Sequence, residues 1–224
     1  MTLTDVMSQL QAAAHEGTKK RYTKNQEPQP FFGVPMGVFT RLAKSLKGQE
    51  TLIPDLWKTG NLDAQVLATY MMDPKKVDPD LVLSLVEREG VSIIVLDKLM
   101  DKVIAKLPEP GLLLSWFETS PRLDHQRLYW SLVARQAINK SMKQEEAQTY
   151  LDRIFSQLGQ TEEPVKWSMN RAQVEIALAY PDLKDQVLAN APLIGAYRDM
   201  KVSKGCTSAY APEWIAAIEK RDQK

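Results

Sequence analysis

Apolar residues recur along most of the chain at intervals of three and four residues, which is the period of a helix with one buried face. The pattern is clearest over residues 112–136, where it predicts two helices joined by a polar turn. Pro121 disfavours helical backbone at Ser120, so we expect the first helix to end there. Asp124 is placed to cap the second helix, because its carboxylate can accept hydrogen bonds from unpaired backbone N–H groups.

A lone hairpin of this kind cannot bury its apolar faces, and similar pairs of helices follow one another from residue 50 to residue 180. The predicted pairs are 52–57 with 64–72, 80–89 with 91–106, 111–118 with 124–139, and 143–158 with 163–180. Their second helices align on Gln65, Ile93, Gln126 and Lys166, which gives steps of 28, 33 and 40 residues. Such steps are typical of stacked helical hairpins, and no alternating run of β-branched residues argues for a sheet. The sequence therefore predicts an all-α fold.

The predicted repeats lie between two flanking segments, and we expect all three to form a single domain over residues 1–224. The division is 1–48 for N-terminal helices and a basic loop, 50–180 for the repeats, and 181–224 for a C-terminal cap. Within the cap, helices are predicted over 183–189 and 213–221.

The N-terminal segment begins with a predicted amphipathic helix over 2–15, which Gly17 is expected to end. A polar loop then carries four closely spaced cations, Lys19, Lys20, Arg21 and Lys24. Two interpretations stay open for this loop. It is either an ordinary solvated connection or an arm that touches phosphates, which attract clustered cations.

Composition narrows the class of protein more than it indicates a function. Apolar content is 44%, charged content is 25% and the formal net charge is +1, as in an ordinary soluble protein, so any nucleic-acid surface needs an uneven placement of charge. Cys206 is the single cysteine, which excludes an internal disulfide framework and a thiolate zinc cluster; we expect it to pack. His15 and His125 have no metal-ligand spacing and are predicted to lie on the surface.

We see no basic leader followed by an apolar core, no membrane-spanning run and no phosphate-binding glycine loop. The chain is therefore predicted to be cytoplasmic and monomeric, with no metal, cofactor or membrane partner.

Three stretches together point to a known family. They are EPQPFFGVPMGVFTRLAKSL at 27–46, VKWSMNRAQVEIAL at 165–178, and LIGAYRDMKVSKGCTSAYAPEWIAAIEK at 193–220. In this order they resemble the DNA alkylation repair family, whose AlkD-like members are HEAT-repeat DNA glycosylases. The resemblance implies a right-handed superhelical stack of HEAT-like helical hairpins, with a concave basic face that cradles duplex DNA. It also implies excision of cationic 3- or 7-alkylated purines by hydrolysis of the N-glycosidic bond, with a carboxylate stabilising the positive charge that develops.

The resemblance assigns the catalytic carboxylate to one acidic residue. The family's catalytic helix resembles the run VSIIVLDKLMD, which places Asp97 at the carboxylate and Ile93 at a position that is aromatic in the family. A second aromatic position of the family falls near Arg171, with Trp167 one turn earlier. The alternatives from the residues alone are that Asp97 belongs to an exposed polar stripe and that Trp167 is a packing residue.

The resemblance also assigns contacts with DNA. The family's DNA-contacting arginine matches Arg127, and Arg171 and Lys166 are expected to contact the backbone beside Trp167. Either arginine could instead form a salt bridge on the surface of the repeats.

Two hypotheses of function follow from these assignments. In the first, the chain is a DNA-alkylation-repair-like protein that binds duplex DNA, alkylated or structured, and excises alkylpurines if the catalytic residues suffice. In the second, it is a non-catalytic helical-repeat scaffold that binds a protein or an unusual DNA structure. Ile93 favours the second, because it replaces the aromatic partner of the carboxylate.

Overall fold

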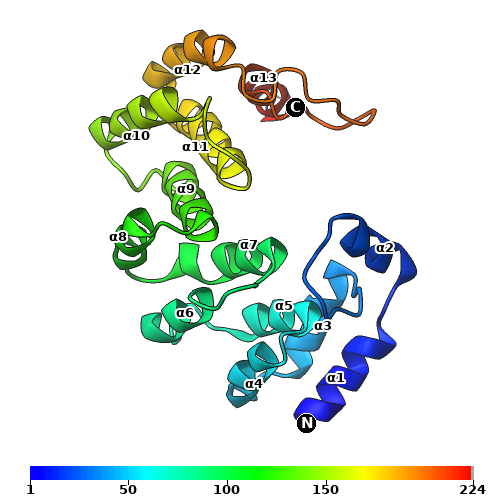
Figure 1. The fold of residues 1–224 in the computed structure, drawn as a ribbon. Helices are drawn as coiled ribbons and strands as arrows, with labels where there is room; N and C mark the ends of the chain where they lie inside the picture. Colours follow the sequence, from blue (N-terminus) through cyan, green and yellow to red (C-terminus); the bar gives the residue numbers. More distant parts are fainter. Residues whose placement is uncertain (223–224) are drawn as a thin grey trace. The chain divides into compact units, whose positions relative to one another are not determined.

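The computed structural model describes residues 1–222, and within them every regular element is helical (Figure 1). The all-α prediction is confirmed. The chain divides into two compact units, the first from Met1 to Ser115 and the second from Trp116 onward, and each is described by itself. None of the helices in this range has the length and apolar character needed to cross a membrane.

Unit 1 is built around α5, which packs against α1, α3, α4 and α7. Nearly all of α5 is buried, and a helix buried on all sides is expected at the centre of a packed unit. The Asn61 side chain caps α5 by accepting hydrogen bonds from the N–H groups of Asp63 and Ala64. The helices of this unit are α1 (Leu3–Ala12), α2 (Glu16–Lys24), α3 (Met36–Ser45), α4 (Ile53–Lys58), α5 (Leu62–Met71), α6 (Pro79–Val86) and α7 (Ile93–Lys102), with short 3-10 helices at Glu50–Leu52 and Ile104–Lys106.

Unit 2 is built in the same way around α11, which packs against α9, α10, α12 and α13. Helix α11 is also buried on most sides, so its polar residues must find partners inside the protein. The remaining helices are α8 (Gly111–Thr119), which begins in unit 1, α9 (Leu123–Ile138), α10 (Gln144–Gln157), α11 (Val165–Ala179), α12 (Pro181–Ile194) and α13 (Ala211–Asp222).

The N-terminal segment differs from its prediction. The first helix ends at Ala12, and the residues expected to form a polar loop form α2 instead, with Gly17 inside that helix. Helix α2 buries only Thr18 and Tyr22, and Tyr22 packs edge-on against Phe31 with ring centroids 5.4 Å apart. Two buried positions one turn apart are enough to hold this short helix on unit 1, but they leave almost no periodic signal in the sequence.

The segment that follows α2 is fixed by the carboxylate of Asp63, which is fully buried at the start of α5. Its Oδ2 accepts hydrogen bonds from the backbone N–H groups of Phe32 (2.6 Å) and Gly33 (2.9 Å), and its Oδ1 accepts one from Val34 (3.0 Å). Burial raises the pKa of Asp63, and the three N–H donors oppose that rise. Gly33 has φ of 86°, and a Cβ there would lie 2.8 Å from the backbone nitrogen of Lys19. The loop is thus held between α5 and α2.

The predicted hairpin over residues 112–136 is present as α8 and α9. Asp124 is not the N-cap residue, but its Oδ1 does accept a hydrogen bond from the backbone N–H of His125 at 3.0 Å. Helix α9 begins at Leu123, with Arg122 in the N-cap position and Asp124 in the first turn. The carboxylate of Asp124 accepts a hydrogen bond from Arg122 Nε at 3.0 Å. The cap segment also differs from the prediction, since α12 extends over fourteen residues rather than over 183–189.

An arginine connects the first three helices of unit 2. Arg153 of α10 donates a hydrogen bond to Glu118 Oε1 of α8 at 2.7 Å, and its guanidinium lies 5.1 Å from the ring centroid of Tyr129 on α9. The Tyr129 hydroxyl donates to the same Glu118 oxygen at 3.0 Å. This shared contact orders the helices on which α11 packs.

Candidate functional site

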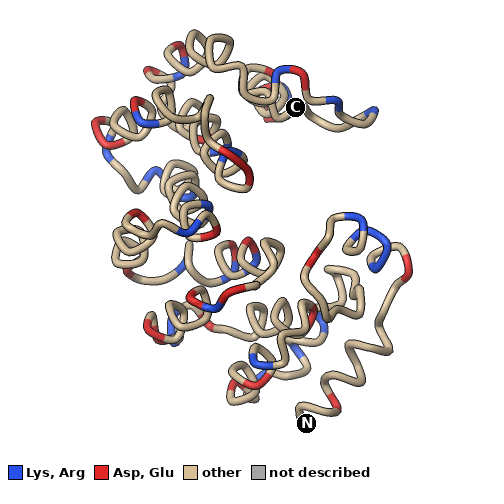
Figure 2. The backbone as a smooth tube through the Cα atoms, in the orientation of Figure 1, with Lys and Arg blue, Asp and Glu red and all other residues tan. Residues whose placement is uncertain are grey.

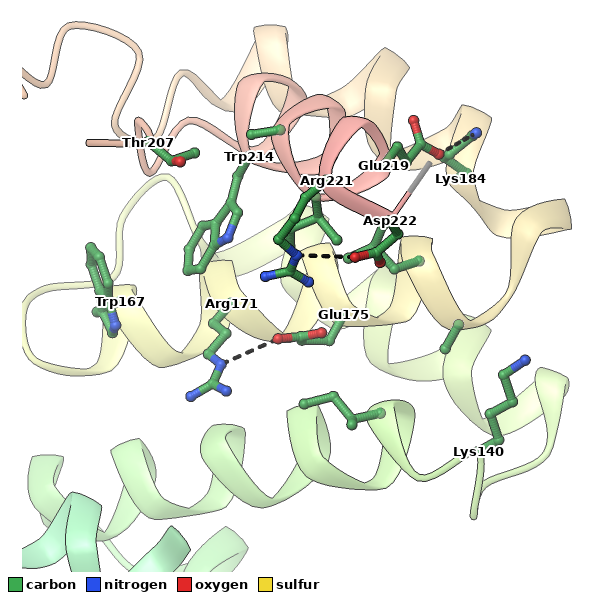
Figure 3. A pocket seen from close by; sticks show the side chains of 15 residues that line it. Lys140, Trp167, Arg171, Glu175, Lys184, Thr207, Trp214, Glu219, Arg221 and Asp222 are labelled. Atoms are coloured by element: carbon green, nitrogen blue, oxygen red, sulfur yellow. Dashed lines mark hydrogen bonds and ion pairs between the residues drawn. The ribbon is translucent and has the colours of Figure 1, made fainter. Parts of the chain in front are cut away.

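Unit 2 contains an open groove of about 1020 Å³ between α11 and α13 (Figure 3). The C-terminal end of α9 and the first half of α12 complete its walls. Its lining mixes tryptophans, aliphatic side chains and charged groups of both signs. Its lining residues include Lys140, Trp167, Arg171, Glu175 and Trp214.

Two partly exposed tryptophans face this groove from different helices. Trp167 lies in the first turn of α11, Trp214 lies in the first turn of α13, and their ring centroids are 5.7 Å apart at an interplanar angle of 41°. Tyr197 packs edge-on against Trp167, also at 5.7 Å. Its hydroxyl donates a hydrogen bond to Glu163, and burial together with that carboxylate raises the pKa of Tyr197. The phenol therefore stays neutral and supports the indole of Trp167.

The position of α13 depends on Asn170, which is fully buried in α11. Its Nδ2 donates a hydrogen bond to the carbonyl of Ala209 at 2.8 Å, just before α13 begins. Its Oδ1 accepts a hydrogen bond from Gln173 Nε2, also at 2.8 Å. Because an unpaired buried amide is costly, this pair of bonds fixes the entry to α13. It thereby sets Trp214 opposite Trp167.

The charged groups of the groove are arranged in neighbouring pairs. Arg171 lies one turn after Trp167 on α11, and its Nε donates to Glu175 Oε1 at 3.4 Å. The Arg171 side chain remains 31% exposed, so this ion pair does not use its full donor capacity. Across the groove, Lys184 pairs with Glu219 at 2.9 Å. Lys140 is exposed at the rim and forms no ion pair with another residue among 1–222. Figure 3 shows Trp167 and Arg171 projecting from α11, and Trp214 projecting from α13.

Trp167 and Arg171 are therefore brought together by the structure, as residues one helical turn apart on one wall. The other two predicted DNA contacts lie elsewhere in unit 2. Arg127 is buried in α9, and its Nη1 donates to the carbonyl of Pro164 at 2.9 Å, directly before α11. Lys166 is half-buried in the first turn of α11 and is not part of the groove wall. The predicted contacts of Arg127 and Lys166 with DNA stay predictions.

Asp97 belongs to unit 1, where it lies half-buried on α7. Ile93, one turn earlier, is 37% exposed. The Ser92 hydroxyl caps α7 by accepting a hydrogen bond from Ile94 N, and it donates to Glu27 Oε2 at 2.6 Å. The Asp97 carboxylate is thus carried by an anchored helix. The residue one turn before it, Ile93, is aliphatic rather than aromatic.

Three features of the structure were not found from the sequence. Trp214 was treated only as part of a cap helix, although its ring lies 5.7 Å from that of Trp167 in the groove. Two other predictions were wrong: His125 is buried, with its Nδ1 2.7 Å from Ser120 Oγ, and Cys206 is exposed. Residues 1–222 hold no group of three or more His, Cys, Asp or Glu arranged to bind a metal ion.

The geometry of the groove suits flat and anionic ligands. Indole faces stack on planar rings, and a guanidinium with free donors binds oxyanions. Aliphatic side chains such as Ile138 and Leu178 line the same groove and would exclude water from a bound ring.

Comparison with known proteins identifies the family. A family model described as DNA alkylation repair enzyme matches residues 6–215. The chain also resembles a solved structure from "a new family of proteins related to the HEAT-like repeat DNA glycosylases with affinity for branched DNA structures". The TM-score is 0.81 at 23% identity, over 99% of this chain and 95% of that one, which shows a shared fold. Curated proteins give no match. Because the family model spans nearly its whole length, the chain belongs to the DNA alkylation repair enzyme family.

Proposed function

We propose that this protein binds DNA through the groove of unit 2, prefers branched DNA to an uninterrupted duplex, and does not excise bases. The observation that carries the proposal is the pair of partly exposed tryptophans, Trp167 and Trp214, beside Arg171 in one open groove. The family membership and the branched-DNA affinity of the structurally similar protein support the same conclusion.

The preference for branched DNA follows from what the tryptophans can contact. In a regular duplex each base is covered on both faces by its neighbours, whereas stacking is interrupted at a branch point. A base face exposed there can stack on the ring of Trp167 or Trp214, which is worth about 1–3 kcal/mol per base. Arg171 and Lys140 supply the cations that flanking phosphates require. The three carboxylates that line the groove, Glu175, Glu219 and Asp222, are held in ion pairs and so repel phosphates less.

The absence of excision follows from the surroundings of Asp97. In the family, the carboxylate works beside an aromatic side chain that packs against the deoxyribose, and this chain has Ile93 at that position. An aliphatic side chain lacks the π-electron density that attracts a developing cation. A second function is the excision of cationic alkylpurines. The one feature that favours it is the carboxylate of Asp97, which is present at the family's catalytic position. Release of 7-methylguanine from methylated DNA by wild type, and not by Asp97→Asn, would establish this second function instead.

The proposal is tested by measuring the affinity of the full chain for a fluorescein-labelled four-way junction and for a duplex of equal length. Trp214→Ala should weaken junction binding by about tenfold or more, because it removes one stacking platform. Trp214→Phe should retain most of the affinity. Trp116→Ala is the matched control, since Trp116 is another half-buried tryptophan of unit 2 that lies outside the groove and packs on His125.

The outcomes distinguish the alternatives. Equal affinities of wild type and Trp214→Ala for the junction would remove the groove from the proposal. No binding of wild type to either DNA at low salt would contradict DNA binding altogether, and would leave the protein-binding scaffold as the better hypothesis.

A further inference from the structure

We propose that the exposed face of α2 is a second DNA-contacting surface, which binds backbone phosphates without reading sequence. This inference rests on the proposed function, because it supposes that DNA is the ligand. The surface, called here the α2 basic face, consists of Lys19, Lys20, Arg21 and Lys24.

The α2 basic face concentrates positive charge on one short helix. All four cations are exposed, and only Thr18 and Tyr22 of α2 are buried. Figure 2 shows lysine and arginine gathered on this helix, whereas elsewhere in unit 1 basic and acidic residues are interspersed. A local concentration of cations raises the potential near the surface and attracts polyanions, although the whole chain has a net charge of only +1.

The four cations are not balanced by partners within the protein. None of them forms an ion pair with another residue in the range 1–222, whereas Lys58, Lys76 and Arg153, for example, each pair with a carboxylate. Arg21 only lies over the ring of its neighbour Tyr22, at 5.8 Å from the centroid. The two acidic residues beside the helix balance only part of its four positive charges. Glu16 lies in the first turn, where it complements the helix dipole, and Glu27 accepts a hydrogen bond from Ser92.

The sequence of α2 is unfavourable for an isolated helix. Lys20 and Lys24 are like charges one turn apart, Gly17 lies inside the helix, and His15 provides no side-chain cap. Stability therefore comes mainly from the protein beneath it, and Glu16, four residues before Lys20, offsets only part of the repulsion among the cations. A bound polyanion would relieve it.

The helix is nevertheless held in a defined position, as a binding surface needs to be. The N–H of His15 donates to the carbonyl of Gly33 at 3.1 Å, and the N–H of Glu27 donates to the carbonyl of Tyr22 at 3.0 Å. Glu27 then reaches Ser92, the cap of α7. The α2 basic face is thus tied at both ends to the packed helices of unit 1, so phosphate binding would not have to order a flexible arm.

The test compares the salt dependence of four-way-junction binding for two triple variants of the full chain. One carries Lys20→Gln, Arg21→Gln and Lys24→Gln; Lys19 is left unchanged because its backbone packs against Gly33. The matched control carries Lys58→Gln, Lys75→Gln and Lys76→Gln, which removes the same charge from exposed positions elsewhere in unit 1. Circular dichroism checks that both fold.

Each phosphate contact contributes about 0.9 to the slope of log affinity against log salt. The α2 variant should therefore lose about 2–3 from that slope, and should bind on the order of tenfold or more weakly at low salt. The control should keep the wild-type slope, and a variant with Lys20→Arg and Lys24→Arg should keep it as well.

Equal slopes for wild type, the α2 variant and the control would overturn the α2 basic face while leaving the groove and the proposed function intact. Failure of wild type to bind any DNA at low salt would overturn the proposed function and this inference together.

Discussion

The carboxylate of Asp63 allows a quantitative prediction about the fold, because all of its partners are known. It accepts three backbone hydrogen bonds from Phe32, Gly33 and Val34 in a fully buried position. Asp63→Asn keeps the shape of the side chain but provides one acceptor oxygen instead of two. That oxygen can serve Phe32 and Gly33, while the new NH₂ group faces the N–H of Val34 and leaves that donor unpaired.

The cost follows from ordinary hydrogen-bond energies. An unpaired buried donor costs about 1–3 kcal/mol, and a bond to a charged acceptor is worth about 1 kcal/mol more than a bond to a neutral one. Two weakened bonds and one lost bond therefore sum to roughly 3–5 kcal/mol. Removal of a buried charge, whose desolvation raises the pKa of Asp63, offsets part of this. We expect a net loss of about 2–4 kcal/mol, a large share of the roughly 5–15 kcal/mol that stabilises a domain.

The assay is urea unfolding of the full chain, combined with hydrogen exchange at residues 32–34. The free energy of unfolding of unit 1 should fall, and the amides of these residues should exchange faster because they lose their acceptor. The control is Asp55→Asn. The Asp55 side chain is 54% exposed, and its ion pair with Lys58, at 4.0 Å, contributes little to the free energy of unfolding. Identical unfolding curves for the two variants, with unchanged exchange at 32–34, would refute this account of the loop.

Further predictions follow from other contacts. Asn170→Leu should destabilise unit 2 by about 2–4 kcal/mol in urea unfolding, because it leaves the carbonyl of Ala209 and the amide of Gln173 unpaired; retained stability would show that Asn170 does not fix α13. Gly33→Ala should lower the thermal midpoint, since its Cβ would meet the backbone of Lys19; an unchanged midpoint would contradict that close approach. Arg127→Ala should lower stability because its guanidinium holds the start of α11, and loss of DNA affinity with unchanged stability would instead support a direct contact.

The sequence predicts the helical hairpins well because their signal is local. Buried apolar residues of α9 and α11 recur at helical spacing, and turns at Gly60, Gly90 and Gly159 separate the two helices within three of the predicted pairs. Resemblance to the family adds the motif at 165–178, whose asparagine proves to be the residue that fixes α13. These parts of the fold depend on neighbours within a few turns of helix.

The parts that were missed depend on distant contacts or on competing partners. Helix α2 buries only two side chains, so its residues look like a loop, and its position is set by Gly33 and Asp63. Trp167 and Trp214 are far apart in the sequence, so the spacing of apolar residues does not show that their rings lie together. Asp124 lies in the first turn rather than at the N-cap and binds Arg122 as well as the N–H of His125, and Arg127 is buried against Pro164. In each case the residue type permits several partners, and packing selects one.

The most direct test of the central claim is the affinity of the wild-type chain for a four-way junction, measured beside a duplex of equal length and composition. We expect tighter binding to the junction, because base stacking is interrupted at its branch point and leaves base faces for Trp167 and Trp214, and we expect binding to weaken steeply as salt is added. Equal affinity for the two DNAs, or no binding to either at low salt, would contradict it.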